Sequence, residues 1–418
     1  MSNNTKQEAM ATNNNDKTLN VPPLRFPEFT GEWENYKFQD ICNLLSGGTP
    51  ALDNPSYWNG NIPFISAATM HNSYIVDSEQ YLSEEGLAHG SKLLQQGNLL
   101  LLVRGSMLWK HIPICYNKLD VAFNQDVKGI IPNKFSQPLF LLYWFESHES
   151  RMKYMVTGTG IGAGKLDTGT LLSMNVSLPS QTEQERIISL LQLLDERIAT
   201  QNKIIEKYES LIQVMCDTLI ESELHKVELA FSDFGESYSG LSGKSAEDFG
   251  EGCPYITYMN VNQNQIIDTT NVGLVKINEA EQQSVVRYGD ILFTLSSETP
   301  EEVGMGAVYL GKTYPLFLNS FCFGVHIMDE NKIFPPFLAY YVSTKSFRKA
   351  VFPLAQGSTR FNLQKNDFMK KIFSFPTVER QKKIYLVLKA YSDKLSVEKS
   401  MAKLFCEHKN HLLRQLFI

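Results

Sequence analysis

Two copies of one long element constrain this 418-residue chain more than any other feature of its sequence. Shifting the sequence by 197 positions, without a gap, aligns residues 179–221 with the C-terminal stretch, residues 376–418. The aligned identical pairs include Pro179 with Pro376, Gln184 with Gln381, Ile187 with Ile384 and Leu219 with Leu416. We therefore expect the two stretches to adopt the same structure.

Each copy carries an apolar stripe whose residues are spaced alternately four and three positions apart, which is the heptad pattern of a coiled-coil helix. The stripe of the first copy consists of Ile187, Leu191, Leu194, Ile198, Ile205, Tyr208, Ile212, Met215 and Leu219. The stripe of the second copy consists of Ile384, Leu388, Tyr391, Leu395, Ala402, Phe405, Leu412 and Leu416. We predict one long helix at residues 179–224 and another at residues 376–418.

The two long helices are expected to pair with each other. A helix of about 40 residues is roughly 60 Å long and needs a partner of similar length to bury such a stripe. Residues 181–224 carry nine acidic and four basic side chains, whereas residues 378–418 carry nine basic and four acidic ones. Opposite charge favours pairing between the copies over self-pairing. The alternative is two independent helices, each packed on a separate globular core.

Polar residues interrupt both stripes at the same heptad position, Gln201 in the first copy and Glu398 in the second. In an antiparallel pair related by a local two-fold axis, these positions meet near the centre of the seam. We therefore expect the two side chains to help fix the register. The second stripe is also interrupted at Lys409, where the first copy has Ile212, and this lysine leaves the tightness of the pairing open.

The composition bounds the class of protein. With 43% hydrophobic residues, the chain has an ordinary globular composition and enough length for two or three domains. It has no long apolar run and no signal-peptide pattern, so we expect a soluble protein of the cytoplasm. The six cysteines stand far apart, which argues against structural zinc and a disulfide framework. The net charge of −6 gives no general sign of a nucleic-acid binder, so such a role has to rest on local patches.

Outside the helices, the sequence falls into a tail and two similar segments. Residues 1–20 are polar, rich in Asn and predicted to be disordered. Residues 21–178 and 225–375 each contain short apolar runs separated by turn residues, as expected for strands of an α+β domain. The motif PFIS at residues 63–66 returns as PYIT at residues 254–257, whereas other stretches differ. We predict two similar α+β domains in a pseudo-two-fold repeat, each recognising something different.

The motifs of catalysis are incomplete in this sequence. Residues 157–165 resemble a phosphate-binding loop, but Thr159 stands where the pattern has glycine, and Leu166 where it has Ser or Thr. Residues 54–57 (NPSY) resemble the Asn-Pro-Pro-Tyr signature of DNA amino-methyltransferases without its second proline. No nucleophile set or pair of acids recurs in both halves. We therefore expect no catalytic residue, no metal and no cofactor on this chain.

Basic, hydroxyl and amide side chains form two candidate DNA-contacting sets. Lys and Arg bind phosphates, while Asn, Gln and Arg can read base edges. The set in the first half comprises Lys92, Arg104, Lys110 and His111. The set in the second half comprises Ser239, Ser242, Lys244, Tyr258, Asn260, Asn262 and Arg360. For any one of these residues, an ordinary solvated surface position is the alternative.

A series of short motifs resembles the specificity subunits of type I restriction-modification systems. The motifs are LRFPEF at residues 24–29 with Gly31 and Trp33, SGGTP at residues 46–50, YSGLSGK at residues 238–244, residues 357–363, and the pattern Pro-x-x-x-x-Gln-x-x-Ile at residues 179–187 and 376–384. Each motif is short, but their order, doubled at a spacing of 197 residues, is specific. The resemblance covers nearly the whole chain after residue 20.

The resemblance implies two target-recognition domains, each reading half of a split sequence in double-stranded DNA, and two antiparallel helices that set the distance between the half-sites. It also implies two modification subunits that carry S-adenosylmethionine and the adenine chemistry, and restriction subunits that use ATP and magnesium. This chain would then be non-catalytic. Two alternatives stay open: a coiled-coil protein adaptor without DNA readout, and an enzyme that modifies nucleic acid by itself.

Overall fold

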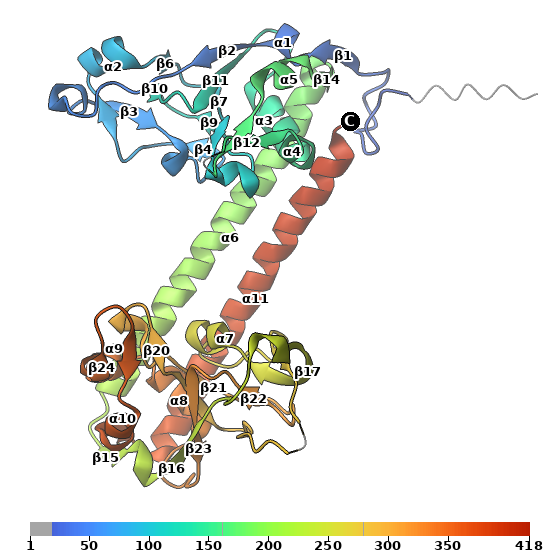
Figure 1. Ribbon diagram of the computed structural model, residues 1–418. Helices are drawn as coiled ribbons and strands as arrows, with labels where there is room; N and C mark the ends of the chain where they lie inside the picture. The colour runs from blue at the N-terminus through green and yellow to red at the C-terminus, as the bar shows by residue number, and fades with distance from the viewer. Residues whose placement is uncertain (1–18, 161, 279) are drawn as a thin grey trace, which may run out of the picture. The chain divides into compact units, whose positions relative to one another are not determined.

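The structure is a computed structural model that describes residues 19–160, 162–278 and 280–418. The predicted disordered tail, residues 1–20, therefore lies almost entirely outside the described residues. The chain forms two compact units. The first unit contains the chain up to Thr200 together with Ala402–Ile418, and the second unit is Gln201–Met401. Figure 1 labels the elements of both units.

Within its described residues, the first unit contains four sheets. The largest has the strand order β2-β11-β7-β9-β4, at Cys42–Ser46, Val127–Pro132, Leu99–Leu102, Ile114–Asn117 and Tyr74–Ile75. A second sheet has the order β5-β3-β10-β6, at Tyr81–Leu82, Ile62–Ile65, Val121–Phe123 and Leu93–Leu94. A three-stranded sheet has the order β12-β13-β8, at Val156–Gly158, Gly164–Leu166 and Arg104–Gly105. The fourth sheet pairs β1 (Glu34–Lys37) with β14 (Asn175–Leu178).

Helix α3 (Pro138–Ser147) lies at the centre of the core of the first unit. Its six residues from Phe140 to Phe145 are all buried and pack in one cluster with strand β7. Pro138 stands at the start of the helix, where its missing N–H leaves no hydrogen bond unmade. The shorter elements of this unit are α1 (Phe38–Ile41), α2 (Glu84–Gly90), α4 (Glu149–Lys153), α5 (Thr168–Ser173), η1 (Pro55–Tyr57), η2 (Ala67–Thr69) and η3 (Ser106–Trp109).

The second unit is built from four sheets of its own in the part that the structure describes. The orders are β16-β23-β19-β21 (Gly235–Ser239, Cys322–Ile327, Ile291–Thr294, Gly306–Val308) and β18-β17-β22 (Gly273–Val275, Phe249–Ile256, Phe317–Leu318). The smaller sheets are β20-β25-β24 (Ser296–Ser297, Phe361–Leu363, Ala355–Gln356) and β15-β26 (Lys226–Ala230, Ile372–Pro376). The short helices are α7 (Tyr258–Gln263), α8 (Pro335–Tyr341), α9 (Lys345–Val351), α10 (Lys365–Lys370), η4 (Phe231–Asp233), η5 (Ala246–Asp248), η6 (Pro300–Glu302) and η7 (Phe352–Leu354).

The two units share one plan. In each, a buried helix that begins with proline, α3 or α8, belongs to the main core cluster. A two-stranded sheet leads into the start of a long helix in both units, as β14 in one and β26 in the other. A three-stranded sheet of the same order, β12-β13-β8 or β24-β25-β20, also recurs. The prediction of two similar α+β domains with an internal repeat is thereby confirmed.

The two long helices are α6 (Gln181–Glu221) and α11 (Val378–Leu416), and each begins two residues after its predicted start. Ser180 caps α6, since its Oγ accepts a hydrogen bond from the backbone N–H of Glu183 at 3.3 Å. Helix α6 begins in the first unit and ends in the second, and α11 does the reverse. Among the described helices, none combines the length and apolar character that crossing a membrane requires.

The stripes of the two long helices are buried within each unit. The fully buried stripe residues are Ile187, Leu191, Ala402, Leu412 and Leu416 in the first unit, and Ile212, Ile384 and Leu388 in the second. The half-buried stripe residues are Leu194, Ile198, Ile205, Tyr208, Met215, Leu219, Tyr391, Leu395 and Phe405. The helix ends are also part of the unit cores. Each helix end therefore packs both on the other helix and on a globular core.

Ion pairs along the seam give the direction of the helices. In the second unit, Lys399 of α11 pairs with Glu209 of α6 at 2.6 Å, and Arg380 of α11 pairs with Glu223, just after α6. A lower residue number on α11 thus meets a higher number along α6. In the first unit, Lys409 of α11 contacts Asp195 of α6, and the lower-numbered Phe405 contacts the higher-numbered Arg197. The helices therefore run antiparallel within each unit.

Candidate nucleic-acid interface

The small sheet β12-β13-β8 places two cations side by side in the first unit. Arg104 of β8 lies directly opposite Lys165 of β13 in the strand register, and both side chains are exposed. Cross-strand neighbours on one face have Cβ atoms about 5 Å apart. The Arg104 Nε lies 3.5 Å from the Asp126 carboxylate, which offsets part of the charge. The sequence predicts Arg104 as a DNA contact, whereas it indicates Lys165 only as the lysine of an incomplete phosphate-binding loop.

An exposed tryptophan accompanies these cations. Trp109, at the end of η3, donates its indole N–H to the carbonyl oxygen of Gly162 at 3.0 Å. This bond ties η3 to the connection between β12 and β13, the hairpin that carries Lys165. The indole is 52% exposed, so it is held in place while a large part of its surface faces solvent.

The other predicted residues of the first unit do not join this sheet. Lys92 precedes β6, which belongs to the sheet β5-β3-β10-β6. Lys110 is exposed just after η3. His111 lines a cavity of about 340 Å³ together with Glu146, Glu149 and Lys409. The predicted set of four is therefore split, and Arg104 is its member on the sheet.

Three predicted residues of the second unit meet at one cavity. Tyr258 and Asn262, both on helix α7, line a cavity of about 360 Å³ with Ser296, Phe321 and Arg360, which come from distant parts of the sequence. Arg360 lies over the Phe321 ring, with 4.9 Å between the guanidinium carbon and the ring centroid. Burial is the main cause that raises the pKa of Tyr258, so its hydroxyl stays protonated and can donate a hydrogen bond at neutral pH.

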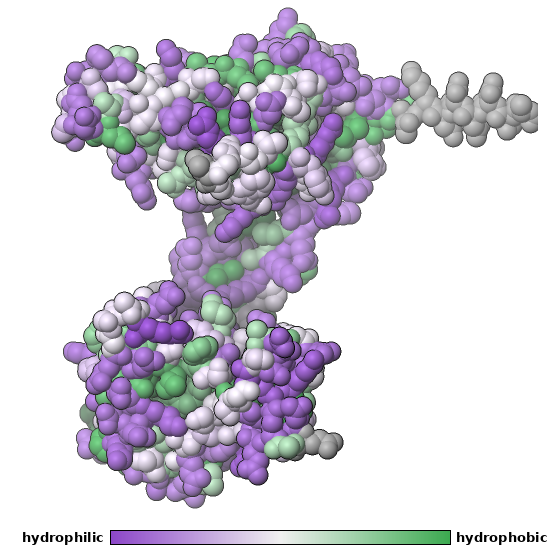
Figure 2. Space-filling model, viewed as in Figure 1, coloured by the Kyte–Doolittle hydropathy of each residue, from purple (hydrophilic) through white to green (hydrophobic). Residues whose placement is uncertain are grey.

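Two further cavities adjoin this one through the turn that carries Ser320 and Phe321. Phe321 also lines a cavity of about 430 Å³ with Lys244. Ser320 is shared between that cavity and another of about 510 Å³, which Ser239 lines. Hydrophilic residues surround a small apolar area on the face of this unit that Figure 2 presents. Five of the seven predicted residues of the second half, all except Ser242 and Asn260, thus line three cavities that share Ser320 or Phe321.

Two residues predicted to contact DNA have hydrogen-bond partners within the second unit. The Lys244 ammonium binds the Glu281 carboxylate at 2.7 Å, and its side chain is only 4% exposed. Asn260 is buried, and its amide donates to the carbonyl oxygens of Asp268 and Asn271 at 2.8 and 2.7 Å. Both side chains therefore order loops of their own unit. Ser242, by contrast, is exposed.

The predicted polar pair in the centre of the stripe is in direct contact. Gln201 Nε2 donates to the backbone oxygen of Glu398 at 3.2 Å and also to its carboxylate. Lys394 binds the same carboxylate at 2.6 Å. Gln201 and Glu398 are both buried, as their shared heptad position predicts.

Lys409, the second interruption of the stripe, is the centre of a half-buried charge cluster in the first unit. Its ammonium lies 2.8 Å from the Glu146 carboxylate and 2.7 Å from that of Asp195. Tyr143 donates a hydrogen bond to Asp195 at 2.7 Å. Burial lowers the pKa of Lys409, but the attraction of Glu146 and Asp195 outweighs it, so the pKa is raised. Lys409 is therefore charged, and it links α11 to both α6 and α3.

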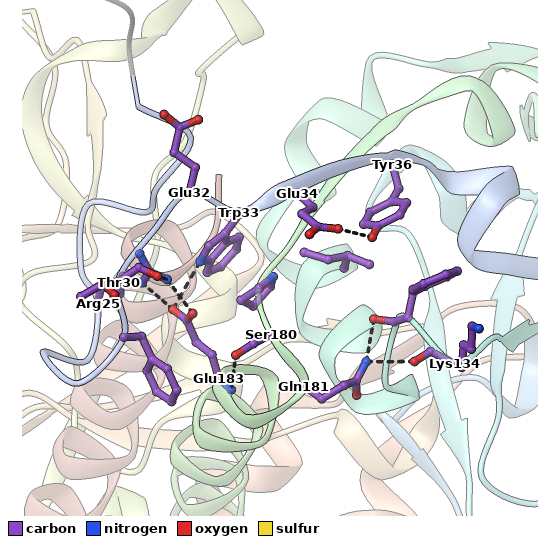
Figure 3. A pocket seen from close by; sticks show the side chains of 14 residues that line it. Arg25, Thr30, Glu32, Trp33, Glu34, Tyr36, Lys134, Ser180, Gln181 and Glu183 are labelled. Carbon is purple, nitrogen blue, oxygen red and sulfur yellow. Dashed lines mark hydrogen bonds and ion pairs between the residues drawn. The ribbon is translucent and has the colours of Figure 1, made fainter.

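The start of α6 holds another ion pair, between a buried carboxylate and a half-buried arginine. Arg25 binds Glu183 through two bonds, Nε to Oε1 at 2.7 Å and Nη2 to Oε2 at 2.8 Å, and Trp33 donates to Glu183 at 3.3 Å. Figure 3 shows these side chains along a cavity of about 390 Å³. The Leu24 N–H donates to the carbonyl oxygen of Gln415. The N-terminal motif therefore fastens both long helices in the first unit.

The possible metal ligands and reactive thiols can be surveyed in the part of the chain that the structure describes. Among these residues, no group of three or more His, Cys, Asp and Glu side chains could hold a metal ion. All six cysteines are free. Burial raises the pKa of Cys42, Cys115 and Cys216 to about 12, so these thiols stay protonated at neutral pH.

Comparison with known sequences gives a family match. The model of the family described as the type I restriction modification DNA specificity domain matches residues 30–210 and 230–403. The specificity subunit of the type I restriction enzyme EcoR124I/EcoR124II of Escherichia coli is 31% identical over 174 residues, or 41% of this chain and 43% of that protein. The MjaVIII specificity subunit of Methanocaldococcus jannaschii is 23% identical over 397 residues, or 90% of this chain and 89% of that protein. The chain thus spans less than half the length of the E. coli relative.

Solved structures have a similar fold. The type I restriction-modification S subunit from M. genitalium superposes with a TM-score of 0.54 at 16% identity, covering 95% of this chain and 99% of that one. A chain from a study of complex assembly and conformational transition in the type I R-M system gives a TM-score of 0.56 at 16% identity, covering 92% and 97%. At this identity the likeness concerns the fold.

Proposed function

Since the chain belongs to the type I restriction-modification DNA specificity family, we propose that it is the subunit that reads the DNA sequence in such a complex. The observation that carries the proposal is the pair of equivalent three-stranded sheets. One strand pair presents Arg104 opposite Lys165 in the first unit, and Ser296 opposite Asn362 in the second. One scaffold thus carries two different sets of polar side chains.

This difference suits two readers of unlike half-sites. Arginine and lysine bind phosphates or the guanine edge, whereas amides and hydroxyls pair with the edges of other bases. Two units of the same fold with different side chains at equivalent positions would recognise different base sequences. We infer that the target is a bipartite and asymmetric site in double-stranded DNA.

The long helices would act as the spacer between the readers. Both run from one unit into the other, so their register affects how far apart the two half-sites are read. The buried contact of Gln201 with Glu398 supports this role, because a polar pair inside an apolar seam disfavours shifted registers.

We further propose that the methylation and cleavage chemistry belongs to partner subunits. Two modification subunits would bring S-adenosylmethionine and methylate adenine, and restriction subunits would bring ATP and magnesium. Such partners would also supply cationic surface, which suits a chain whose own net charge is −6. We place this non-catalytic role in the cytoplasm, where the DNA target of such a system lies.

Chemical footprinting of the purified chain with its modification subunit tests the proposal. We expect protection of one bipartite sequence, with unprotected bases between the two halves. Protection that is absent, or equal on all sequences, would contradict DNA readout and favour the coiled-coil protein adaptor.

A further inference from the structure

We propose that the cavity lined by Ser296 and Asn262 reads one base pair of the half-site recognised by the second unit, by accepting a hydrogen bond from an exocyclic amino group, adenine N6 or cytosine N4. This inference rests on the proposed function and deepens it. It assigns a specificity-determining role to Ser296, which the sequence did not single out, and a defined ligand chemistry to Asn262.

The first reason is that two polar atoms at the cavity lack partners within the protein. Ser296 is 4% exposed, and its Oγ makes no hydrogen bond to any described residue. The same holds for the buried Oδ1 of Asn262. Buried polar side-chain atoms are nearly always paired in folded proteins, and exceptions at a cavity point to a ligand. Both residues line the same cavity.

Neighbouring side chains of the same types are fully used. Ser297, the next residue, donates its hydroxyl to Glu302 at 2.7 Å. The amide of Asn260, two residues before Asn262, donates through its NH2 group and accepts through its oxygen in bonds to the loop that it organises. Among the serine and asparagine side chains that line this cavity, the Ser296 Oγ and the Asn262 Oδ1 are therefore the buried atoms without a partner among the described residues.

The charge of the cavity selects the kind of ligand. Glu298 and Glu302 line it, and Arg360 is its one cation among the described lining residues. Two carboxylates disfavour a phosphate in the cavity, but they favour N–H donors. In the major groove, the donors that bases present are the amino groups of adenine and cytosine, and Asn and Glu are side chains that pair with them. A base edge thus fits this cavity better than the DNA backbone does.

Arg360 is placed to hold the flanking backbone. It is exposed at the cavity, and its guanidinium is oriented by contact with the Phe321 ring. No ion pair of Arg360 occurs within the described ranges of the chain. An oriented guanidinium with free N–H groups can bind a phosphate next to the base pair that is read.

The equivalent position in the first unit has a different chemistry, which makes the inference testable. Arg104 stands where the second unit has Ser296, since each lies opposite the corresponding residue of the middle strand. Changes at Ser296 and Asn262 should therefore alter one half of the recognised sequence and leave the other half as it is.

The test uses the full chain with its modification subunits and maps methylated adenines across a genome. For Ser296→Ala and Asn262→Ala, we expect discrimination at one base pair of one half-site to fall by about 10- to 100-fold, while the other half-site keeps its sequence. Asn331→Ala serves as the matched control, because Asn331 is exposed in a turn of the same unit, and it should leave the methylated sequence unchanged.

The outcomes separate the inference from the proposed function. An unchanged sequence in both alanine variants would overturn the role of the cavity, although the chain would remain a sequence reader. Wild-type protein that directs no sequence-dependent methylation would overturn the proposed function itself. If an alanine variant fails to fold, Asn262→Leu decides: it keeps a similar side-chain volume but removes the Oδ1 acceptor, and an unchanged sequence with this variant would contradict the inference.

Discussion

The first and second units differ in charge at equivalent positions: a charged residue in one unit corresponds to a neutral residue in the other. At the helix seam, Lys409 binds Glu146 and Asp195 in the first unit. The equivalent residues of the second unit, each 197 positions away in the sequence, are Ile212, Ser343 and Ser392. The tyrosine hydroxyl that donates to Asp195 has a counterpart in Tyr340, which donates to Ser392 at 3.0 Å.

This difference teaches what the buried charges contribute. A buried ion pair is weak evidence for stability, because desolvation offsets the attraction. An ion pair of this kind can instead determine which helices pair with each other. A helix pair made of two copies of α6 would place Ile212 against Asp195 and leave carboxylates without a cation. The charged triad therefore favours pairing of α6 with α11 over pairing of like helices.

The largest loss of folding stability is expected from Lys409→Met. Removing the cation leaves Glu146 and Asp195 in the seam without their partner, which should lower the free energy of unfolding by about 3–5 kcal/mol. Ile212→Met, at the equivalent position of the second unit, is the control and should cost less than about 1.5 kcal/mol. Urea unfolding measures both. Equal losses in the two variants would remove the distinction between the units.

A second comparison concerns the ion pairs at the starts of the long helices. Arg25 binds the almost fully buried Glu183, whereas the position equivalent to Glu183 is Arg380, which is more exposed and pairs with Glu223. We expect Arg25→Ala to lower the free energy of unfolding by about 1.5–3 kcal/mol. Arg380→Ala should cost less than Arg25→Ala, because solvent screens an exposed ion pair. Thermal unfolding of both variants would show whether this order holds or is reversed.

Gln201→Leu sharpens the comparison at the centre of the seam. The change removes a donor to Glu398, which keeps its bond to Lys394, so the stability loss should be about 1 kcal/mol. The informative readout is the length of the gap between half-sites in methylated DNA. We expect gaps of more than one length. A single unaltered gap with unaltered helix alignment would count against a role in register.

The reading surfaces should differ in their response to salt. Lys165→Ala should weaken DNA binding and reduce the slope of log affinity against log salt by about 1, since one phosphate contact is lost. Asn362→Ala, at the equivalent position, should leave the slope unchanged because an amide displaces no counterion. Titrations at several salt concentrations distinguish the two. A reduced slope in both variants would contradict the assignment of unlike chemistry to the two sheets.

The smallest effect is a pH dependence confined to the first unit. Burial, as the largest cause, lowers the pKa of His148 from its ordinary 6.5, so the unfolded chain binds this proton more tightly. The contribution of His148 to stability is therefore present above pH 6.5 and lost as the pH falls below it. The second unit has Lys345 at this position. Hydrogen exchange at two pH values should show the loss in the first unit, and His148→Gln should abolish it.

Sequence periodicity predicted the parts of the fold that depend on local pattern. The heptad stripes gave both long helices, and their shared interruption gave the contact of Gln201 with Glu398. The partners of Lys409 were not predictable in this way, because Glu146 comes from α3 and meets α11 only in the folded unit. The sequence left the tightness of the seam open for that reason.

The candidate interface was predicted less completely, since residue type does not reveal burial. Lys244 and Asn260 have suitable side chains for DNA contact, but loops of their own unit occupy them. Ser296 gave no signal because a serine in a short strand is common. Lys165 could have been found by aligning the small sheets of the two halves, since strand register places it opposite Arg104.

Mapping methylated adenines in a genome that carries this chain with its modification subunits tests the central claim most directly. Two unlike units of one fold predict a single bipartite sequence whose halves differ and are separated by a gap of fixed length. Methylation that does not depend on this chain, or that follows one uninterrupted sequence, would contradict the account.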